Sequence, residues 1–418
     1  MNRLAAAILI PFSNVAAEGG PPVHEFRIGA DIAYVDASGY PSWTSGSVGK
    51  LRYDDDSDGL VASRAYVDYH GRLADTVDAN LVAQVYVDDF GSGIDISEAF
   101  LRWRPMVDSR YRFRLKLGAF FPRLSFENTE AGWDSPYTIN SSTINTWIAE
   151  ELRTVGAEGS VSRRLSGFGG AHTLSLQVAA FVANDPAGSL LAWRGWSAHD
   201  RQSRVYDELP LPALPQLQPG MMFDRQDPFD APFREVDDRA GYYADVEWRI
   251  GNQALLRAMH YDNRAEPTAL RNGQYAWHTE FDALGAQVSL PADAGLVLQW
   301  IRGTTRMGPA SNGVHVVDAD FSSYFLLLSK TIDRHRLSAR YEDFDVTDND
   351  GTALDDNAEH GDVLTMAYRY EATANVALAV EWLQISTFRP AWAYAGLVPD
   401  KTERQFEFVV RLRFGNRG

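Results

Sequence analysis

The sequence predicts an all-β fold, a closed antiparallel transmembrane β-barrel of about sixteen strands. Three observations point to it: segments of alternating apolar and polar residues recur along the chain, prolines lie outside these segments, and short connections alternate with long ones. The longest apolar run near the start, Leu4–Ile10, is far shorter than the about 18 residues of a spanning helix. A helical membrane protein is therefore excluded.

The composition excludes several classes of function. The 418 residues include 39 basic and 56 acidic ones, for a net charge of −17, and no cysteine. The negative charge argues against general binding to nucleic-acid phosphates. Without cysteine there is no disulfide, iron–sulfur cluster, cysteine zinc site or thiol nucleophile.

The first residues resemble an export signal. Arg3 precedes the apolar stretch Leu4–Ile10, and Val15, Ala16 and Ala17 form a small-residue cleavage site. A disordered N-terminus is the alternative, because the apolar stretch is short and ends at a proline. We predict a signal peptide over 1–17 and a single barrel domain over 18–418. Cleavage removes one positive charge and no acid, so the mature charge is −17 − 1 = −18.

The last segment illustrates the strand pattern. Apolar side chains occupy every even position from Phe406 to Phe414, and mostly charged or polar ones occupy the odd positions. A period of two is typical of a strand with one apolar face. The same pattern predicts strands at about 26–35, 62–70, 77–88, 95–104, 110–118, 153–162, 171–183, 240–250, 254–261, 277–290, 294–302, 319–329, 335–344, 362–371, 375–386 and 405–414. None of the 19 prolines, which cannot donate to a sheet ladder, falls inside them.

The connections are sorted by length, which favours a membrane barrel over a soluble sandwich. Those at about 71–76, 105–109, 163–170, 251–253, 291–293, 330–334 and 372–374 are short. Those at about 36–61, 119–152, 184–239, 262–276, 303–318, 345–361 and 387–404 are long, and only 89–94 breaks the rule. Outer-membrane barrels have short periplasmic turns and long extracellular loops. An even strand number places both termini on the periplasmic side.

Strand parity assigns the side chains of segment 110–118. Tyr111, Phe113, Leu115 and Leu117 must face lipid, because a charge at the bilayer midplane costs about 2–4 kcal/mol. The cations between them, together with those of the preceding strand, then face the lumen and form what we call the basic stripe: Arg102, Arg104, Arg110, Arg112, Arg114 and Lys116.

The other inward positions are also polar. They are Asp78, Asp88, Glu158, Asp245, Glu247, Arg340, Glu342, Glu381, Arg411 and Arg413. A packed core cannot satisfy so many ions, so this lining indicates a water-filled bore. The basic stripe has two interpretations: it selects anions moving through the bore, or it pairs with wall carboxylates such as Asp78, Asp88 and Glu158.

A family resemblance rests on the segment after the basic strand. Gly118-Ala119-Phe120 leads to Ser125-Phe126-Glu127, and this segment resembles the glycine-x-phenylalanine run ending in serine-x-glutamate of the phosphate-selective porins O and P. Downstream, Glu150 and the Arg153-x-x-Gly156 pattern resemble the point at which the family's wall resumes. The match covers only about 110–162.

The resemblance implies a homotrimer of sixteen-stranded channels whose third outer loop folds inward as a constriction. That loop would be 119–152, with charged members Arg123, Glu127, Glu130, Asp134, Glu150 and Glu151. The departures are Pro122, one position early, and the scarcity of lysine. Only Lys50, Lys116, Lys330 and Lys401 occur, whereas phosphate-selective members carry lysine clusters. A general or weakly anion-preferring channel is therefore the expectation.

The predicted function is passive diffusion of small hydrophilic solutes through a non-enzymatic porin of the cell outer membrane, in contact with lipid and lipopolysaccharide. One alternative is a non-conducting adhesin or scaffold barrel. Another is a barrel hydrolase, which needs a serine or aspartate nucleophile beside a histidine on adjacent strands, and no convincing set is evident. We predict no metal or cofactor: Asp54-x-Asp56-x-Asp58 opens like a calcium loop, but Ala65 stands where a glutamate is needed.

The connection 184–239 is the longest, and it contains Trp193 and Trp196. We expect an ordered surface loop there. A lid, a ligand platform and a trimer contact are the alternatives.

Overall fold

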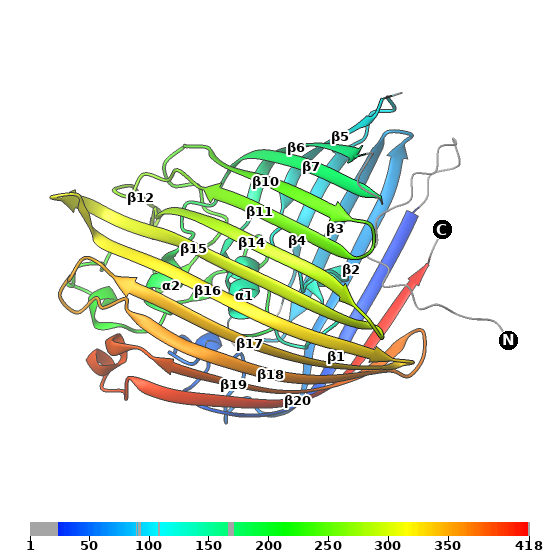
Figure 1. Cartoon of the computed structure of the whole chain (residues 1–418). Helices are drawn as coiled ribbons and strands as arrows, with labels where there is room; N and C mark the ends of the chain where they lie inside the picture. The colour runs from blue at the N-terminus through cyan, green and yellow to red at the C-terminus, as the bar shows by residue number, and fades with distance from the viewer. Residues whose placement is uncertain (1–23, 89, 91–92, 108, 166–170, 417–418) are drawn as a thin grey trace.

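The computed structural model describes residues 24–88, 90, 93–107, 109–165 and 171–416. Sixteen antiparallel strands form one closed barrel, which confirms the predicted fold class (Figure 1). The wall strands are β1 (His24–Ser38), β2 (Gly59–Ala74), β3 (Val77–Tyr86), β4 (Ile94–Trp103), β5 (Tyr111–Phe120), β6 (Thr154–Leu165), β7 (His172–Val182), β10 (Gly241–Ile250), β11 (Ala254–Asp262), β14 (His278–Leu290), β15 (Ala294–Ser311), β16 (Val314–Ile332), β17 (His335–Asp348), β18 (Glu359–Glu371), β19 (Val376–Phe388) and β20 (Asp400–Asn416). Each predicted segment overlaps one of them. The predicted signal peptide lies outside the described residues.

The remaining elements are short and lie in the connections. They are β8 (Leu209–Pro210), β9 (Phe229–Asp230), β12 (Leu270–Arg271), β13 (Gln274–Tyr275), α1 (Thr143–Glu151), α2 (Ser189–Trp193) and the 3₁₀ turns η1 (Trp43–Ser45), η2 (Ala131–Trp133), η3 (Pro215–Leu217) and η4 (Pro390–Ala395). Over the described ranges, no helix combines the length and the apolar character needed to span a membrane.

The wall has an apolar outer face, as strand parity predicts. On β5, the side chains of Tyr111, Phe113 and Leu117 are between 41 and 47% exposed on the outside, whereas Lys116 is mostly buried on the inside. Strands whose outer face is this apolar are stable only against hydrocarbon.

The barrel closes where β1 pairs with β20, from Phe26 opposite Asn416 to Ser38 opposite Arg404. The chain therefore enters and leaves the wall at one end, which is the end with the short turns (Figure 1). We call the two ends of the barrel the short-turn end and the long-loop end.

The predicted long connection at 303–318 is wrong. β15 and β16 run on as strands of 18 and 19 residues, joined by the two-residue turn Asn312-Gly313. Both turn residues have positive φ, 54° and 88°, which suits Asn-Gly. The pattern was missed because outward positions such as Thr304 and Arg306 are polar: beyond the membrane the strand no longer needs an apolar outer face.

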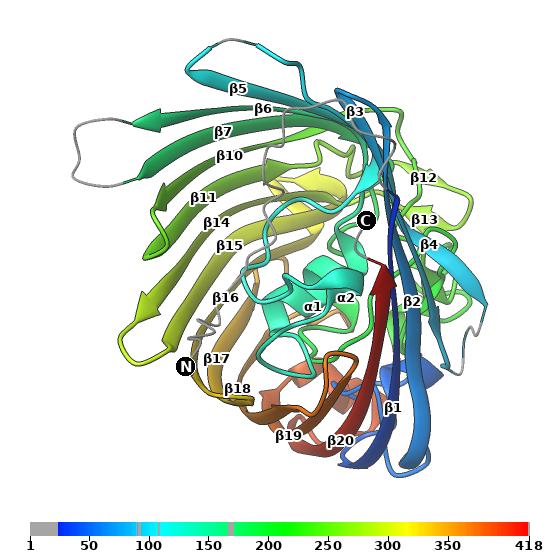
Figure 2. The same ribbon diagram turned by 90° about the vertical axis from the view of Figure 1, so that its right-hand side faces the viewer.

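Two long connections fold into the barrel, one more than predicted. The first inserted loop, 121–153, joins β5 to β6 and carries α1. The second, 183–240, joins β7 to β10 and carries α2. Both helices lie inside the ring of strands (Figure 2). The expectation of a surface loop at 184–239 is wrong, because Trp193 and Trp196 are each only 1% exposed. Each loop leaves and re-enters the wall at paired residues, Phe120 opposite Thr154 and Phe181 opposite Gly241.

Candidate functional site: the lumen

The first inserted loop crosses the bore and binds the far wall through its backbone. The N–H groups of Ile139 and Asn140 donate to the Glu381 carboxylate on β19, at 2.5 and 3.0 Å. The N–H of Thr143, at the start of α1, donates to Glu342 on β17 at 2.6 Å. Wall carboxylates thus fix the loop in place.

Arg340 on β17 is the centre of this attachment. Its fully buried guanidinium donates to Glu127 of the loop at 3.0 Å, to Glu342 at 2.7 Å and to the Asn140 carbonyl at 3.0 Å. The expectation that Arg340, Glu342 and Glu381 line a wet bore is wrong. Ions that face inward are satisfied here by a loop from elsewhere in the chain and not by water.

A second attachment surrounds Asp134. Its carboxylate lies 2.6 Å from Arg411, 2.9 Å from Arg64 and 3.0 Å from Arg413, which are wall residues of β20 and β2. Burial alone raises the pKa of Asp134, but Arg411, Arg64 and Arg413 outweigh it and hold that pKa well below its ordinary range. Arg411, expected to line a wet bore, is therefore also used to anchor the loop.

Gly285 on β14 gives the loop a third contact. A Cβ at Gly285 would lie 2.1 Å from the Phe126 ring, so only glycine leaves room for this ring against the wall.

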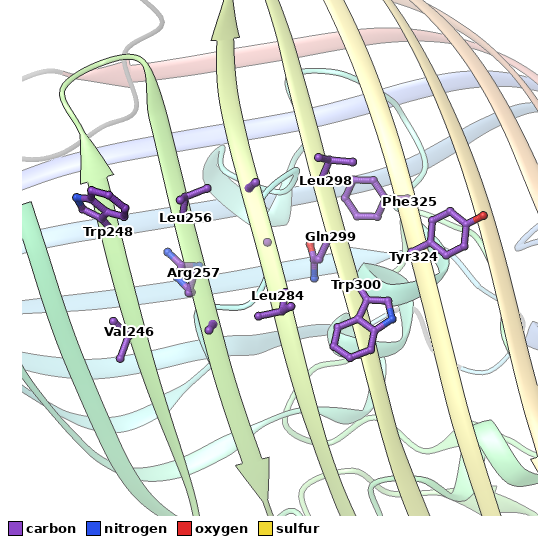
Figure 3. A pocket seen from close by; sticks show the side chains of 13 residues that line it. Val246, Trp248, Leu256, Arg257, Leu284, Leu298, Gln299, Trp300, Tyr324 and Phe325 are labelled. Carbon is purple, nitrogen blue, oxygen red and sulfur yellow. The ribbon is translucent and has the colours of Figure 1, made fainter.

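On the outer face of the same strands, small residues leave an apolar hollow of about 470 Å³ rimmed by Trp248, Trp300 and Tyr324 (Figure 3). This hollow lies on the lipid side and not in the lumen.

The long-loop end of the lumen is filled by parts of 39–58, 121–153 and 183–240, which we call the plug. Trp193 packs edge-on against Trp277, with 4.9 Å between ring centroids. Trp196 packs edge-on against Phe321 of β16, with 6.2 Å between ring centroids. The plug also contains buried ions, such as Lys50, whose ammonium lies 2.5 Å from Glu359 on β18. Burial lowers the pKa of Lys50 to about 8, against the opposing pull of Glu359.

Glu150 and Glu151, predicted as members of a constriction, are buried inside the plug. Arg194 donates to both oxygens of Glu150, and the His199 ring lies 3.1 Å from it. Burial raises the pKa of Glu150, but Arg194 and His199 lower it more, to about 2. Glu150 is thus a structural ion that links the two inserted loops.

Among the residues that the structure describes, Glu151 pairs with no cation and instead faces Asp230. The Ser189 hydroxyl lies 3.2 Å from Glu151 and 2.7 Å from Asp230, and the N–H of Leu190 donates to Glu151 at 2.8 Å. Burial raises the pKa of Glu151 to about 7 and that of Asp230 well above its ordinary value. The two carboxyl groups can therefore retain a proton at the joint between the loops.

The basic stripe is divided between paired and unpaired cations. Arg102 and Arg104 lie 2.8 and 2.5 Å from Asp78, and Lys116 lies 3.2 Å from Glu158, as the pairing interpretation expects. Asp88 instead binds the plug, through Arg52 and Arg201.

The other three stripe residues differ from these. Arg110 precedes β5 and is exposed, so its expected place in the wall is wrong. Arg112 and Arg114 lie on β5, and neither has an ion pair or side-chain hydrogen bond to another residue that the structure describes.

A cavity of about 420 Å³ remains beneath the first inserted loop, toward the short-turn end. Of the predicted site residues, Arg102, Arg114, Lys116, Arg123 and Glu130 line it. Glu127, Asp134, Glu150 and Glu151 are buried at the loop's contacts. Water reaches the cavity, because the side chains of Arg102 and Arg123 are 24 and 34% exposed.

Sequence reasoning missed three further cations of the cavity, Arg27, Arg249 and Arg257. Arg257 lies at an inward position of a predicted strand, opposite Glu247, so strand parity was a sufficient signal for it. Two groups have carboxylate or imidazole atoms within 4.8 Å of one another, Asp262–His278–Glu280 and Asp185–Glu235–Asp237. Both lie at the long-loop end, and we assign no metal to them.

No protein-family model matches the sequence, and no curated protein matches it either. Solved structures do match. An anion-selective porin from Comamonas acidovorans is 11% identical, with 94% of this chain and 99% of that one covered and a TM-score of 0.50. The outer membrane channel DcaP of Acinetobacter baumannii is 11% identical, with 94 and 97% covered and a TM-score of 0.53. A loop-deletion mutant of OmpT, an outer membrane protein of Vibrio cholerae, is 9% identical, with 94 and 99% covered and a TM-score of 0.50.

These likenesses concern the fold. The barrel matches outer-membrane proteins of Gram-negative bacteria, in keeping with the predicted location. The narrower resemblance to porins O and P stays a prediction.

Proposed function

We propose that this chain is an outer-membrane porin through which small hydrophilic solutes diffuse passively, with a preference for anions. The observation that carries the proposal is the water-reached cavity inside a closed barrel, lined by Arg102, Arg114, Lys116 and Arg123. The short-turn end, with both termini, would face the periplasm. The fold shared with solved porins supports the same function.

The preference would arise from fixed charge in a narrow passage. Cations on the wall lower the free energy of an anion in the bore and raise that of a cation. The first inserted loop, held by Arg340 and Asp134, narrows the bore and sets the size limit. The net negative charge of the chain does not oppose this, because exposed loop charges are screened within about 8–10 Å.

A non-conducting scaffold or adhesin barrel is the second candidate, and the plug favours it, because tryptophans and buried ion pairs fill the long-loop end. The hydrolase alternative needs a serine or aspartate nucleophile beside a histidine on adjacent strands. Two aspartate–histidine pairs have this arrangement, His260 with Asp282 at 2.9 Å and His278 with Asp262 at 3.1 Å, and they lie away from the cavity that carries the proposal.

Planar-bilayer recording of the purified protein tests the proposal. We expect stepwise conductance. In a KCl gradient, we expect a reversal potential closer to the equilibrium potential of chloride than to that of potassium. Charge reversal of the pair Arg112→Glu and Arg114→Glu should shift this potential toward potassium. Arg225→Glu, on the exposed part of the second inserted loop, is the matched control and should not. An absence of conductance steps would refute the channel and favour the scaffold. An unchanged anion-to-cation permeability ratio in the double variant would refute the proposed source of the anion preference.

Assembly as a homotrimer and removal of residues 1–17 belong to the same proposal. Light scattering on the detergent-solubilised protein measures the first, and N-terminal sequencing of protein from the outer membrane measures the second.

A further inference from the structure

The cavity beneath the first inserted loop combines positive charge with aromatic surface. Seven of its lining residues are cationic and four are acidic, an excess of 7 − 4 = 3 positive charges: Arg27, Arg102, Arg114, Lys116, Arg123, Arg249 and Arg257 against Asp68, Glu98, Glu130 and Glu158. Its volume of about 420 Å³ lies within the ~300–1,000 Å³ of small-molecule sites.

Arg114 differs from its paired neighbours in the cavity. Arg102, Lys116 and Arg257 each have a carboxylate within 3.2 Å, whereas Arg114 has no ion pair or side-chain hydrogen bond within the described part of the chain. It lies within the electrostatic reach of three cations, Arg123, Arg102 and Arg104, and of one carboxylate, Glu247. A half-buried guanidinium among other cations favours an anion from outside, and its planar fork matches a carboxylate.

The inserted loop contributes aromatic rings to the lining of the same cavity. Phe121 and Trp133 stack at 4.5 Å between centroids with an interplanar angle of 25°. Phe121 and Phe126 are buried, with the guanidinium groups of Arg153 and Arg257 over their rings, so Trp133 is the partly exposed ring of the three. Trp133 adopts a left-handed φ of 63°, costly for a residue with a side chain. Its indole Nε1 is buried without a hydrogen-bond partner within the described residues. The loop therefore presents this ring to the cavity at a conformational cost.

We infer that the cavity is a binding site for small aromatic carboxylates, with the carboxylate on Arg114 and the ring beside Trp133. The inference rests on the proposed function, because the ligand would enter through the short-turn mouth of the channel. A small inorganic anion would use the guanidinium and leave the ring surface bare. A neutral aromatic molecule would leave Arg114 unpaired.

Titration calorimetry on the detergent-solubilised full chain tests the site without any need for conductance. The probes are benzoate, acetate, inorganic phosphate and benzyl alcohol. We expect benzoate to bind about tenfold more tightly than each of the other three. Equal binding of benzoate and acetate or phosphate would overturn the role of the rings, and equal binding of benzyl alcohol would overturn the role of Arg114.

Two variants locate the site, and a third serves as control. Arg114→Gln should weaken benzoate binding about tenfold and leave the weak binding of benzyl alcohol unchanged. Trp133→Leu, which keeps an apolar side chain, should weaken benzoate more than acetate, and Arg225→Gln should change neither. Melting temperatures check that the variants are folded. Full benzoate affinity in folded Arg114→Gln overturns the inference. Conductance without benzoate binding refutes the site alone, and benzoate binding without conductance refutes the porin alone.

Discussion

Two regions of the lumen, the contacts of the first inserted loop and the cavity beneath it, use arginine in opposite ways. At the loop contacts, Arg340 is fully buried and bonded to two carboxylates and a carbonyl. In the cavity beneath the loop, Arg114 forms no ion pair with a described residue. Both face inward from wall strands. The role of an inward arginine is thus decided by whether an inserted loop brings a carboxylate to it.

Removing Arg340 should have the largest effect on this contrast. Arg340→Met leaves Glu127 and Glu342 buried without their cation, which costs about 3–5 kcal/mol. We expect a lower melting temperature in detergent and, because the loop loses its anchor, a larger single-channel conductance. Arg271→Met, which breaks an exposed pair with Asp238, should melt close to the parent, because solvent screens such pairs. Equal melting temperatures for the two variants would contradict the assigned difference.

The stability of the folded protein should fall as pH rises, because of a carboxyl group in the plug. Burial raises the pKa of Glu151 from 4.5 to about 7. Below about pH 4.5 the carboxyl is protonated in both the folded and the unfolded chain. Between 4.5 and 7 the folded protein keeps a proton that the unfolded chain has released, so stability falls as pH rises, by on the order of 3 kcal/mol in all. Asp230 acts in the same direction.

Melting curves at pH 5 and pH 7.5 measure this slope. Glu151→Gln should flatten it, whereas Glu208→Gln, at an exposed carboxylate, should leave it as it is. A Glu151→Gln protein with the original pH dependence would mean that the proton is held elsewhere.

The contact between Gly285 and Phe126 gives a smaller effect. Gly285→Ala places a methyl group 2.1 Å from the ring and should cost about 1–3 kcal/mol through overpacking. Adding Phe126→Ala should recover part of that loss, because the clash is removed. Gly295→Ala on β15, whose nearest neighbour would be 3.8 Å away, is the control and should melt close to the parent.

Arg114→Gln should have the smallest effect on stability. Because Arg114 has no ion pair to lose among the described residues, the variant should stay within about 0.5 kcal/mol of the parent in melting experiments, even as its reversal potential moves toward the potassium equilibrium potential. A loss comparable to that of Arg340→Met would show that the two regions do not differ.

The wall was predictable from sequence because lipid imposes a local rule. Tyr111, Phe113 and Leu117 must face hydrocarbon, so their spacing alone fixes the strand and the inward direction of its cations. The rule ends with the membrane. The alternation therefore predicts this strand only to about residue 302 and does not predict the hairpin that turns at Asn312-Gly313.

The interior was not predictable in the same way. Glu127 is 213 residues from Arg340 in sequence, and periodicity along either segment contains no information about the other. One signal was available in the second inserted loop. Its sequence contains a cluster of large apolar residues, Leu190, Leu191, Trp193 and Trp196, and a solvated loop would not be so apolar. The second inserted loop could therefore have been assigned to the interior. Its partners could not.

The pairing of Phe120 with Thr154 and of Phe181 with Gly241 limits how the passage can widen. Each inserted loop is tied at both ends to neighbouring points on the rim of a continuous cylinder. While these wall pairs hold, a wider passage requires the inserted part of a loop to move relative to two adjacent attachment points at the long-loop rim.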